Sequence, residues 1–412
     1  MCLFGLRQWG IFVLRTDADH RRVEFADVPR DKETINLTTD LQESRSVTDR
    51  QQRSFGIEEE YLLLDQVTGR PVNLAPELQR VGTRSGFVAE REFLSCQLET
   101  STPICVSAQE ASTTLHEFRT KMSAAAADHG VILAGVGLPP VGNETTGRVT
   151  PNDRYLQIKP MLGRAGWYHY STGLHVHVEV PNKDIGAEVI ARVARWIPAL
   201  VALSANSPIW EGKPTGFASW RHLQGITWPV SGYPPFFDSA ADYERTLDNL
   251  IRSNIILDQG VVNWSVRLSQ KFPTVEFRFA DAQLNQADSV AIAIILRSLV
   301  EKTVNEIIAG FTRPRLDISL VQGAIWCAAR DGLSDTLIDP LEARRVPAFE
   351  FVDLMIDNIA TELHIFGDFA RVSQYKTDRL NDGGPACRQL KQLDSLGVDG
   401  LIDLFQSELV VP

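Results

Sequence analysis

Three stretches of the chain alternate apolar residues with charged or polar ones, and this alternation restricts the fold more than any other feature. They are FGIEEEYLLLD (55–65), GLHVHVEV (173–180) and PTVEFRFAD (273–281). Because successive side chains of a strand point to opposite faces, each stretch predicts a strand with one apolar and one polar face. Such strands are typical of antiparallel sheets, whereas buried parallel strands are apolar throughout. We therefore expect an α+β fold with a largely antiparallel sheet.

Helical periodicity and turn residues predict the elements between these strands. Apolar residues at a spacing of 3.6 predict helices over 109–130, 186–208, 241–254 and 285–311, and an almost wholly helical part after Arg313. Residues 87–99 and 131–140 are expected to be extended, and the Pro-, Gly- and Trp-rich segment 217–235 to be a long loop. No GxGxxG or GxxxxGK[ST] motif occurs, so neither a dinucleotide-binding fold nor a P-loop is predicted.

Length and charge limit the domain organisation and the partners. We expect residues 1–53, which are polar and aperiodic, to form a poorly ordered extension, and 54–412 to form a single domain with a helical part at 313–412. The net charge of -11 disfavours nonspecific binding to nucleic acid or anionic membranes. No apolar run approaches the about 20 residues of a membrane span. Five widely spaced cysteines without CxxC favour a reducing, cytoplasmic location. A homo-oligomer is left open.

The polar faces of the three strands carry a set of potential metal ligands. They collect Glu58 and Glu60 on the first strand, His175, His177 and Glu179 on the second, and Glu276 and Arg278 on the third. Glu59 points to the opposite face, where we expect it to reach a sheet edge. Its replacement by Gln should therefore affect activity only mildly compared with replacement of Glu58. Glu58 and Glu60 lie so close that one should be protonated unless a cation sits between them.

A fourth extended segment, FLSCQLET (93–100), adds carboxylates on one condition. Alternation places Phe93, Ser95, Gln97 and Glu99 on one face and Glu92 on the other. Glu92 joins Glu99 only if the chain bends or bulges before Phe93. We predict that bend.

A lone Glu-x-Glu is usually solvated, and His-x-His in a strand is more often not a metal site than one. The repetition of the same layout on several strands favours one polar sheet face that binds metal ions and phosphates. Carboxylates with one imidazole suit Mg²⁺, which keeps waters and substrate phosphates in its shell, or Mn²⁺.

Five motifs in order resemble those of the glutamate–cysteine ligase type 2 family, the bacterial carboxylate–amine ligases. They are GIExE (56–60), QLET (97–100), NDRY (152–155), GxHVHV (173–178) and TVExRxxD (274–281), and AARDGL (328–333) follows them. The resemblance runs from about Ser54 to the C-terminal helices. Each motif alone is weak, whereas the ordered set is specific.

The resemblance implies a catalytic sheet like that of glutamine synthetase, which binds ATP and two or more Mg²⁺ ions. Carried over by motif, the metal ligands would be Glu58, Glu60, Glu92, Glu99, His175 and Glu276. Arg278 would lie against the transferred phosphate with Arg267 as a second catalytic residue, and Arg154 and Arg221 would bind substrate or ATP. Glu92 stands where the family more often has Asp, and Ser265 and Leu268 depart from the family's WDxRPS pattern.

The implied reaction is ATP-dependent amide formation between a glutamate γ-carboxylate and an amine such as cysteine, through an acyl phosphate. Three alternatives stay open. A metal-dependent amidohydrolase would need further histidines downstream, and only His222 and His364 follow the GxHVHV motif at 173–178. A phosphotransferase would use the same sheet without forming an amide. A catalytically idle relative would bind nucleotide or act as a partner of another protein.

Overall fold

The structure is a computed structural model that describes residues 52–142, 147–163 and 169–411. The expected extension at 1–53 therefore lies outside the described residues, except for Gln52 and Arg53. Residues from Gln52 onward form one compact unit. Arg53 is anchored to this unit, because its Nε donates to Glu301 Oε2 over 2.6 Å.

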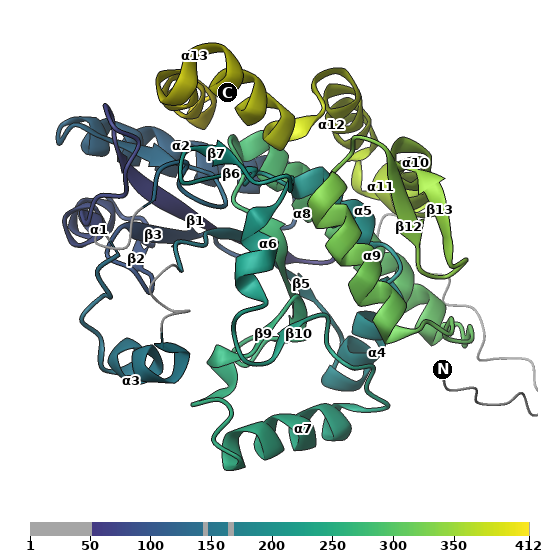
Figure 1. Cartoon of the computed structure of the whole chain (residues 1–412). Helices are drawn as coiled ribbons and strands as arrows, with labels where there is room; N and C mark the ends of the chain where they lie inside the picture. The colour runs from purple at the N-terminus through teal and green to yellow at the C-terminus, as the bar shows by residue number, and fades with distance from the viewer. Residues whose placement is uncertain (1–51, 143–146, 164–168, 412) are drawn as a thin grey trace, which may run out of the picture. The chain divides into compact units, whose positions relative to one another are not determined.

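A seven-stranded antiparallel sheet forms the centre of this unit (Figure 1). Strand β1 (Phe55–Asp65) lies between β5 (Gly173–Glu179) on one side and β3 (Gln97–Ser101) on the other. The order continues from β5 through β11 (Thr274–Asp281) to β10 (Val266–Leu268), and from β3 to β2 (Glu90–Arg91). The last strand, β4 (Val131–Ala134), pairs with the end of β1. The predicted α+β class and the antiparallel sheet are confirmed.

Helices cover the apolar face of this sheet. Helix α2 (Ala108–Ala127) contacts β1 and β4, α8 (Gln286–Ile308) contacts β1 and β5, and α4 (Lys183–Val193) contacts β10 and β11. Ser107 starts α2 with a capping box to Glu110, and Asn285 caps α8, which satisfies backbone N–H groups that a helix leaves free. The opposite face of the sheet is left for a cavity.

Two expectations about helices are wrong in detail. The predicted helix over 186–208 is two helices, α4 and α5 (Ile197–Ser204), because Pro198 lacks an N–H and fits only the first turn of a helix. The predicted loop over 217–235 contains α6 (Trp220–Gly225), which Ser219 caps, and β8 (Ser231–Gly232), which pairs with β9 (Asn263–Trp264).

The part after Arg313 is mainly helical but includes a hairpin that the periodicity did not predict. Its strands are β12 (Thr336–Asp339) and β13 (Arg344–Pro347). The remaining elements are α1 (Ala75–Arg84), α3 (Asp153–Leu162), β6 (Ile209–Trp210), β7 (Lys213–Pro214), α7 (Ala240–Arg252), η3 (Gln259–Val261), α9 (Ile318–Asp331), α10 (Ala348–Asn358), α11 (Ala360–Phe366), α12 (Phe369–Asp382) and α13 (Gly384–Leu409). No helix in the described ranges is both long and apolar enough to cross a bilayer.

The segment 87–99 is a hairpin rather than one extended run. Strands β2 and β3 pair antiparallel, and the chain turns between them at residues 93–96. The Gln97 N–H donates to Leu94 O over 2.9 Å and closes that turn. The predicted bend near Phe93 is confirmed, although Ser95 lies in the turn and not on a shared strand face.

Candidate active site

A cavity of about 820 Å³ lies over the polar face of the sheet. Nine of the ten residues predicted for the site line it: Glu58, Glu60, Glu92, Glu99, Arg154, His175, Arg221, Arg267 and Arg278. The tenth, Glu276, is only 3% exposed and lies against Arg267 and Arg278. The alternation of the strands brings most of the predicted residues together, whereas Arg154 reaches the cavity from α3 and Arg221 from α6.

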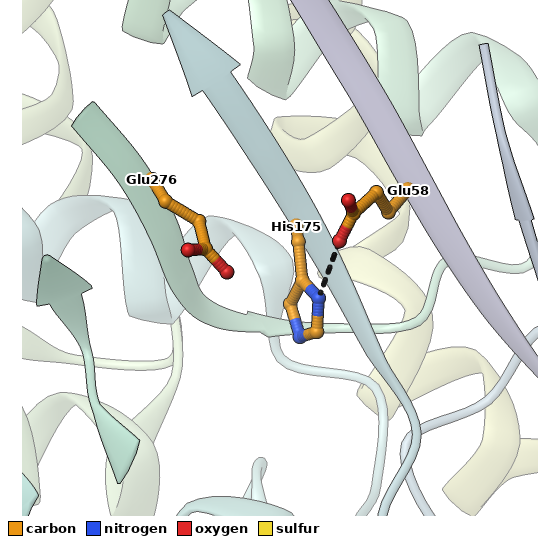
Figure 2. Close-up of side chains that lie close together, drawn as sticks. All are labelled: Glu58, His175 and Glu276. Carbon is orange, nitrogen blue, oxygen red and sulfur yellow. Dashed lines mark hydrogen bonds and ion pairs between the residues drawn. The ribbon is translucent and has the colours of Figure 1, made fainter. Parts of the chain in front are cut away.

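The first set of potential ligands comes from three adjacent strands. Glu58 on β1, His175 on β5 and Glu276 on β11 each offer one ligand atom, and these atoms lie within 4.8 Å of one another. Figure 2 shows the three side chains on the same side of their strands. Register explains the pairing, because Glu58 lies directly opposite His175. Glu58 Oε2 is 3.3 Å from His175 Nδ1.

Basic groups surround the carboxylates of this first set. Arg267 holds Glu276 with two hydrogen bonds of 2.7 and 3.0 Å, and Arg278 Nη1 donates to the same carboxylate over 2.5 Å. Burial alone would raise the pKa of Glu276, but the charges of Arg278 and Arg267 lower it. Burial likewise opposes ionisation of Glu58, yet hydrogen bonds from His175 and His177 hold its pKa well below the usual range. Both carboxylates are therefore charged and compensated.

The second set consists of carboxylates alone. Glu60 on β1, Glu99 on β3 and Glu92 beside the turn each offer an oxygen within 4.8 Å of the other two. Glu60 and Glu99 are register partners, and the turn at 93–96 returns Glu92 to their side. Burial, and then the charge of Glu92, raise the pKa of Glu99 well above its ordinary value, and burial raises that of Glu60. Repulsion of this kind is relieved by a bound cation, so this donor set fits a divalent metal ion.

Glu59 points away from the cavity, as predicted, but it does not reach a sheet edge. Strand β1 has a neighbour on each side, and Glu59 is 2% exposed. Its carboxylate accepts hydrogen bonds from Arg119 Nη2 at 2.6 Å and from Ser289 Oγ at 2.5 Å, and it also bonds the Tyr61 hydroxyl. The expectation of an edge position is wrong, because the register places Glu59 over the helical layer.

Arg154 and Arg221 both face the cavity but differ in how fully they are bonded. Arg154 makes a paired contact with Asp258 through two hydrogen bonds of 2.9 Å. Arg221 has only long contacts, 3.4 Å to the carbonyls of Arg278 and Phe279 and 3.8 Å to Asp281. Its Nε is buried and has no partner in the described part of the chain. Arg221 therefore keeps donors available for a ligand.

Several aromatic, basic and thiol side chains near the motifs take structural positions. Trp220 packs on Phe217, and Tyr233 is buried with its hydroxyl donating to Ile190 O. His177 bonds Thr274 and Glu58 and so supports His175. Arg330 pairs with the adjacent Asp331 at the end of α9. The cysteines of the described ranges are free thiols, of which Cys96 and Cys105 are buried and Cys327 and Cys387 partly exposed.

Further cavity residues were not predicted. His169 and His222 line the wall, as does Tyr155, whose hydroxyl is 3.5 Å from Glu92. These residues lie outside the alternating strands, so periodicity gave no signal. Arg119, the partner of Glu59 in the core, could have been predicted to be buried, since it falls on the same helical face as Leu115 and Met122. His364 stacks on Phe369 instead of lining the cavity, so of the two downstream histidines named for the hydrolase alternative only His222 lies in the cavity wall.

Comparison with known proteins gives concordant matches. The model of glutamate–cysteine ligase family 2 matches residues 54–404. A protein of Mycobacterium sp. (strain KMS), provisionally named glutamate–cysteine ligase 2-2, is 35% identical over 82% of this chain and 92% of its own length. A protein of Salinispora tropica, provisionally named glutamate–cysteine ligase 2, is 36% identical over 84% of this chain and 92% of its own length.

Two solved structures share the fold. Glutamate–cysteine ligase from Francisella tularensis, in complex with AMP, matches with a TM-score of 0.63 and 13% identity, over 88% of this chain and 89% of that chain. A bifunctional glutathione synthetase from Pasteurella multocida matches with a TM-score of 0.64 and 15% identity. That match covers 87% of this chain but only 52% of the Pasteurella chain, so the present chain spans about half its length.

Proposed function

The chain belongs to glutamate–cysteine ligase family 2, and from this premise we propose that it is an ATP-dependent carboxylate–amine ligase. The proposed product is an amide between the γ-carboxylate of a glutamate-like acid and an amine. The observation that carries the proposal is the gathering of two ligand sets and four arginines around one cavity over the polar face of the sheet. We propose that residues 54–412 act as one ligase domain.

The proposed reaction has two steps. An oxygen of the γ-carboxylate attacks the terminal phosphorus of ATP, and ADP leaves to give an acyl phosphate. The amine nitrogen then attacks the acyl carbon, inorganic phosphate leaves, and the nitrogen loses a proton. The protein needs no covalent nucleophile of its own for this sequence, because phosphoryl transfer depends mainly on positioning and charge stabilisation.

The two ligand sets are the proposed metal sites. Glu58, His175 and Glu276 would form one, and Glu60, Glu92 and Glu99 the other. Divalent ions such as Mg²⁺, or Mn²⁺ as the alternative, would neutralise the phosphates of ATP. The all-carboxylate set suits a hard cation, because burial raises the pKa of Glu60 and Glu99 and the charge of Glu92 raises both further.

The arginines are assigned to anionic parts of the substrates. Arg278 lies beside Glu276 and His175, and its Nε has no partner in the residues described, so we place the transferred phosphate there. Arg267 holds Glu276 in position with paired hydrogen bonds. Arg221, with its free donors, and Arg154 would bind ATP or a substrate carboxylate.

The names of similar proteins suggest which substrates to try first. Relatives at about 35% identity are provisionally named glutamate–cysteine ligases, and the Francisella enzyme binds AMP. Glutamate, cysteine and ATP are therefore the first candidates. The free thiols fit the cytoplasmic location expected from the sequence, which stays part of the proposal.

The test measures ADP release from Mg-ATP with L-glutamate against a panel of amines that includes cysteine, with mass spectrometry of each mixture for an amide. ADP release that requires both substrates and yields an amide is expected. Glu58→Gln, which removes a charge from the cavity and not from the core, should abolish release without unfolding the protein. Release without an amide for any amine would favour the phosphotransferase. No ATP turnover would contradict the proposal.

A further inference from the structure

His169 is a wall residue of the cavity whose ring is held in one orientation. Its Nδ1 accepts a hydrogen bond of 2.9 Å from the indole N–H of Trp228, and the two ring centroids are 4.6 Å apart. Phe93 packs edge-on against both rings, with centroids 6.2 Å from His169 and 6.1 Å from Trp228. Phe93 directly follows Glu92, so this aromatic cluster joins the imidazole to the hairpin that carries Glu92 and Glu99 of the second ligand set.

The bond from Trp228 determines where the imidazole carries its proton. An indole N–H can only donate, so Nδ1 must present its lone pair, and the proton of the neutral ring lies on Nε2. Burial, followed by the charge of Arg221, lowers the pKa of His169 to about 3, which keeps the ring neutral at pH 7. In the ranges that the structure describes, no residue hydrogen-bonds Nε2. The ring therefore offers one donor and cannot act as a base while the Trp228 bond is intact.

We propose that His169 is a substrate-binding residue that donates its Nε2–H to an anionic oxygen, a carboxylate or a phosphate, and that Trp228 is a positioning residue that fixes its tautomer. This inference rests on the proposed function, because it adds a contact to the same cavity. The neutral imidazole donates its Nε2–H to an acceptor oxygen. It cannot hydrogen-bond an ammonium group in this way, because an ammonium group can only donate. A substrate amine that binds as an ammonium ion must then place its nitrogen away from His169.

The tautomer is tested by long-range ¹H–¹⁵N spectra of the full chain labelled on histidine, at pH 7. The expected His169 signal, assigned by its loss in His169→Gln, is that of a neutral ring protonated on Nε2. Trp228→Phe should replace it with an averaged pattern. Trp220→Phe, a matched change in the same segment that packs on Phe217 outside the cavity lining, should leave it unchanged. A ring protonated on Nδ1, or a charged ring, overturns the proposal.

Binding is tested with two replacements of different reach. The amide N–H of His169→Gln approximates the position of Nε2, whereas that of His169→Asn approximates Nδ1. We expect Gln to keep substrate affinity within roughly 3-fold and Asn to weaken it by roughly 10- to 100-fold, the loss of one hydrogen bond to a charged group. Weaker Mg-ATP binding identifies a phosphate oxygen, and weaker binding of the acid or amine identifies a carboxylate. Wild-type affinity in both variants, or equal loss of kcat in both at unchanged KM, overturns the proposal.

The spectra also separate this proposal from the proposed function. Mg-ATP, L-glutamate and cysteine are titrated singly, and the His169 Nε2 signal is followed in wild-type protein. A shift of the His169 Nε2 signal on addition of Mg-ATP, glutamate or cysteine supports the contact even when no ADP is released. The absence of ADP release would contradict the proposed ligase activity but not the contact. A signal that none of the three ligands moves overturns the assignment of His169, whatever the turnover.

Discussion

Replacing Glu59 by Gln should destabilise the protein while sparing its chemistry. The change keeps the shape of the side chain but removes the negative charge that pairs with Arg119, and both side chains are at most 2% exposed. Breaking a buried pair by neutralising one partner costs about 3–5 kcal/mol. Arg119 keeps its bonds of 2.9 Å to Leu284 O and 3.1 Å to Gln283 O, which argues for the lower part of that range.

That loss corresponds to a measurable shift in melting temperature. Unfolding entropy of about 2.1 cal/mol/K per residue, taken over Gln52–Pro412, gives roughly 0.75 kcal/mol/K. Glu59→Gln should therefore lower Tm by about 4–7 °C in differential scanning calorimetry. At 20 °C, where the variant stays folded, its ATP turnover should remain within about 5-fold of wild type, while Glu58→Gln has none and melts within a few degrees of wild type.

A double-mutant cycle with Arg119→Met tests the cause. The two substitutions should be less than additive, with a coupling energy of roughly 1–3 kcal/mol, because each removes the same ion pair. The reasoning is refuted if Glu59→Gln melts like wild type, or if it loses turnover as fully as Glu58→Gln without a change in Tm.

Three other perturbations give distinct results. Arg154→Ala should change stability by at most about 1 kcal/mol, because its pair with Asp258 is about 40% exposed, yet it should raise the KM of one substrate; an unchanged KM would make Arg154 purely structural. Mg²⁺ should raise the Tm of wild type and raise it less in Glu99→Gln, and EDTA should reverse the rise; equal shifts would argue against the second metal site. Burial, followed by the Arg221 charge, lowers the pKa of His169 to about 3 and that of His222 to about 4, so the unfolded chain binds more protons below pH 6.5. These two histidines should thus each lower stability by up to about 2 kcal/mol as pH drops from 7 to 5, against the opposite effect of the raised pKa values of Glu60 and Glu99, and a double Gln variant that kept the wild-type slope in urea titrations would contradict this.

The face of each strand was predictable because alternation is local. Glu58 and Glu60 faced the cavity and Glu59 the helices, as the period of two requires. The order of the strands was not predictable in this way, since periodicity does not specify neighbours. The edge position expected for Glu59 failed for that reason, whereas the mild effect of Glu59→Gln on ATP turnover stays a prediction.

Other differences arose where one residue overrides a longer pattern. Pro198 starts a new helix inside a continuous helical period, and a short hairpin at 336–347 interrupts the helical C-terminal part. His169 was not predicted because its position depends on Trp228 and Phe93, which are distant in sequence. A residue whose role comes from such long-range packing leaves no periodic signal in a single sequence.

The two ligand sets differ in how much of the chain must be made before each can assemble. Glu60, Glu92 and Glu99 lie within one early segment that folds as β1 with the β2–β3 hairpin, whereas Glu276 joins the first set from β11. At roughly 5–20 residues per second of synthesis, the ribosome needs on the order of 10 s or more to reach it. During that interval β1 can pair with β3 while the early carboxylates stand together without the arginines of the later strands. Only a chain that has reached β11 holds both ligand sets together with the arginines of the later strands, so truncation before β11 should abolish turnover.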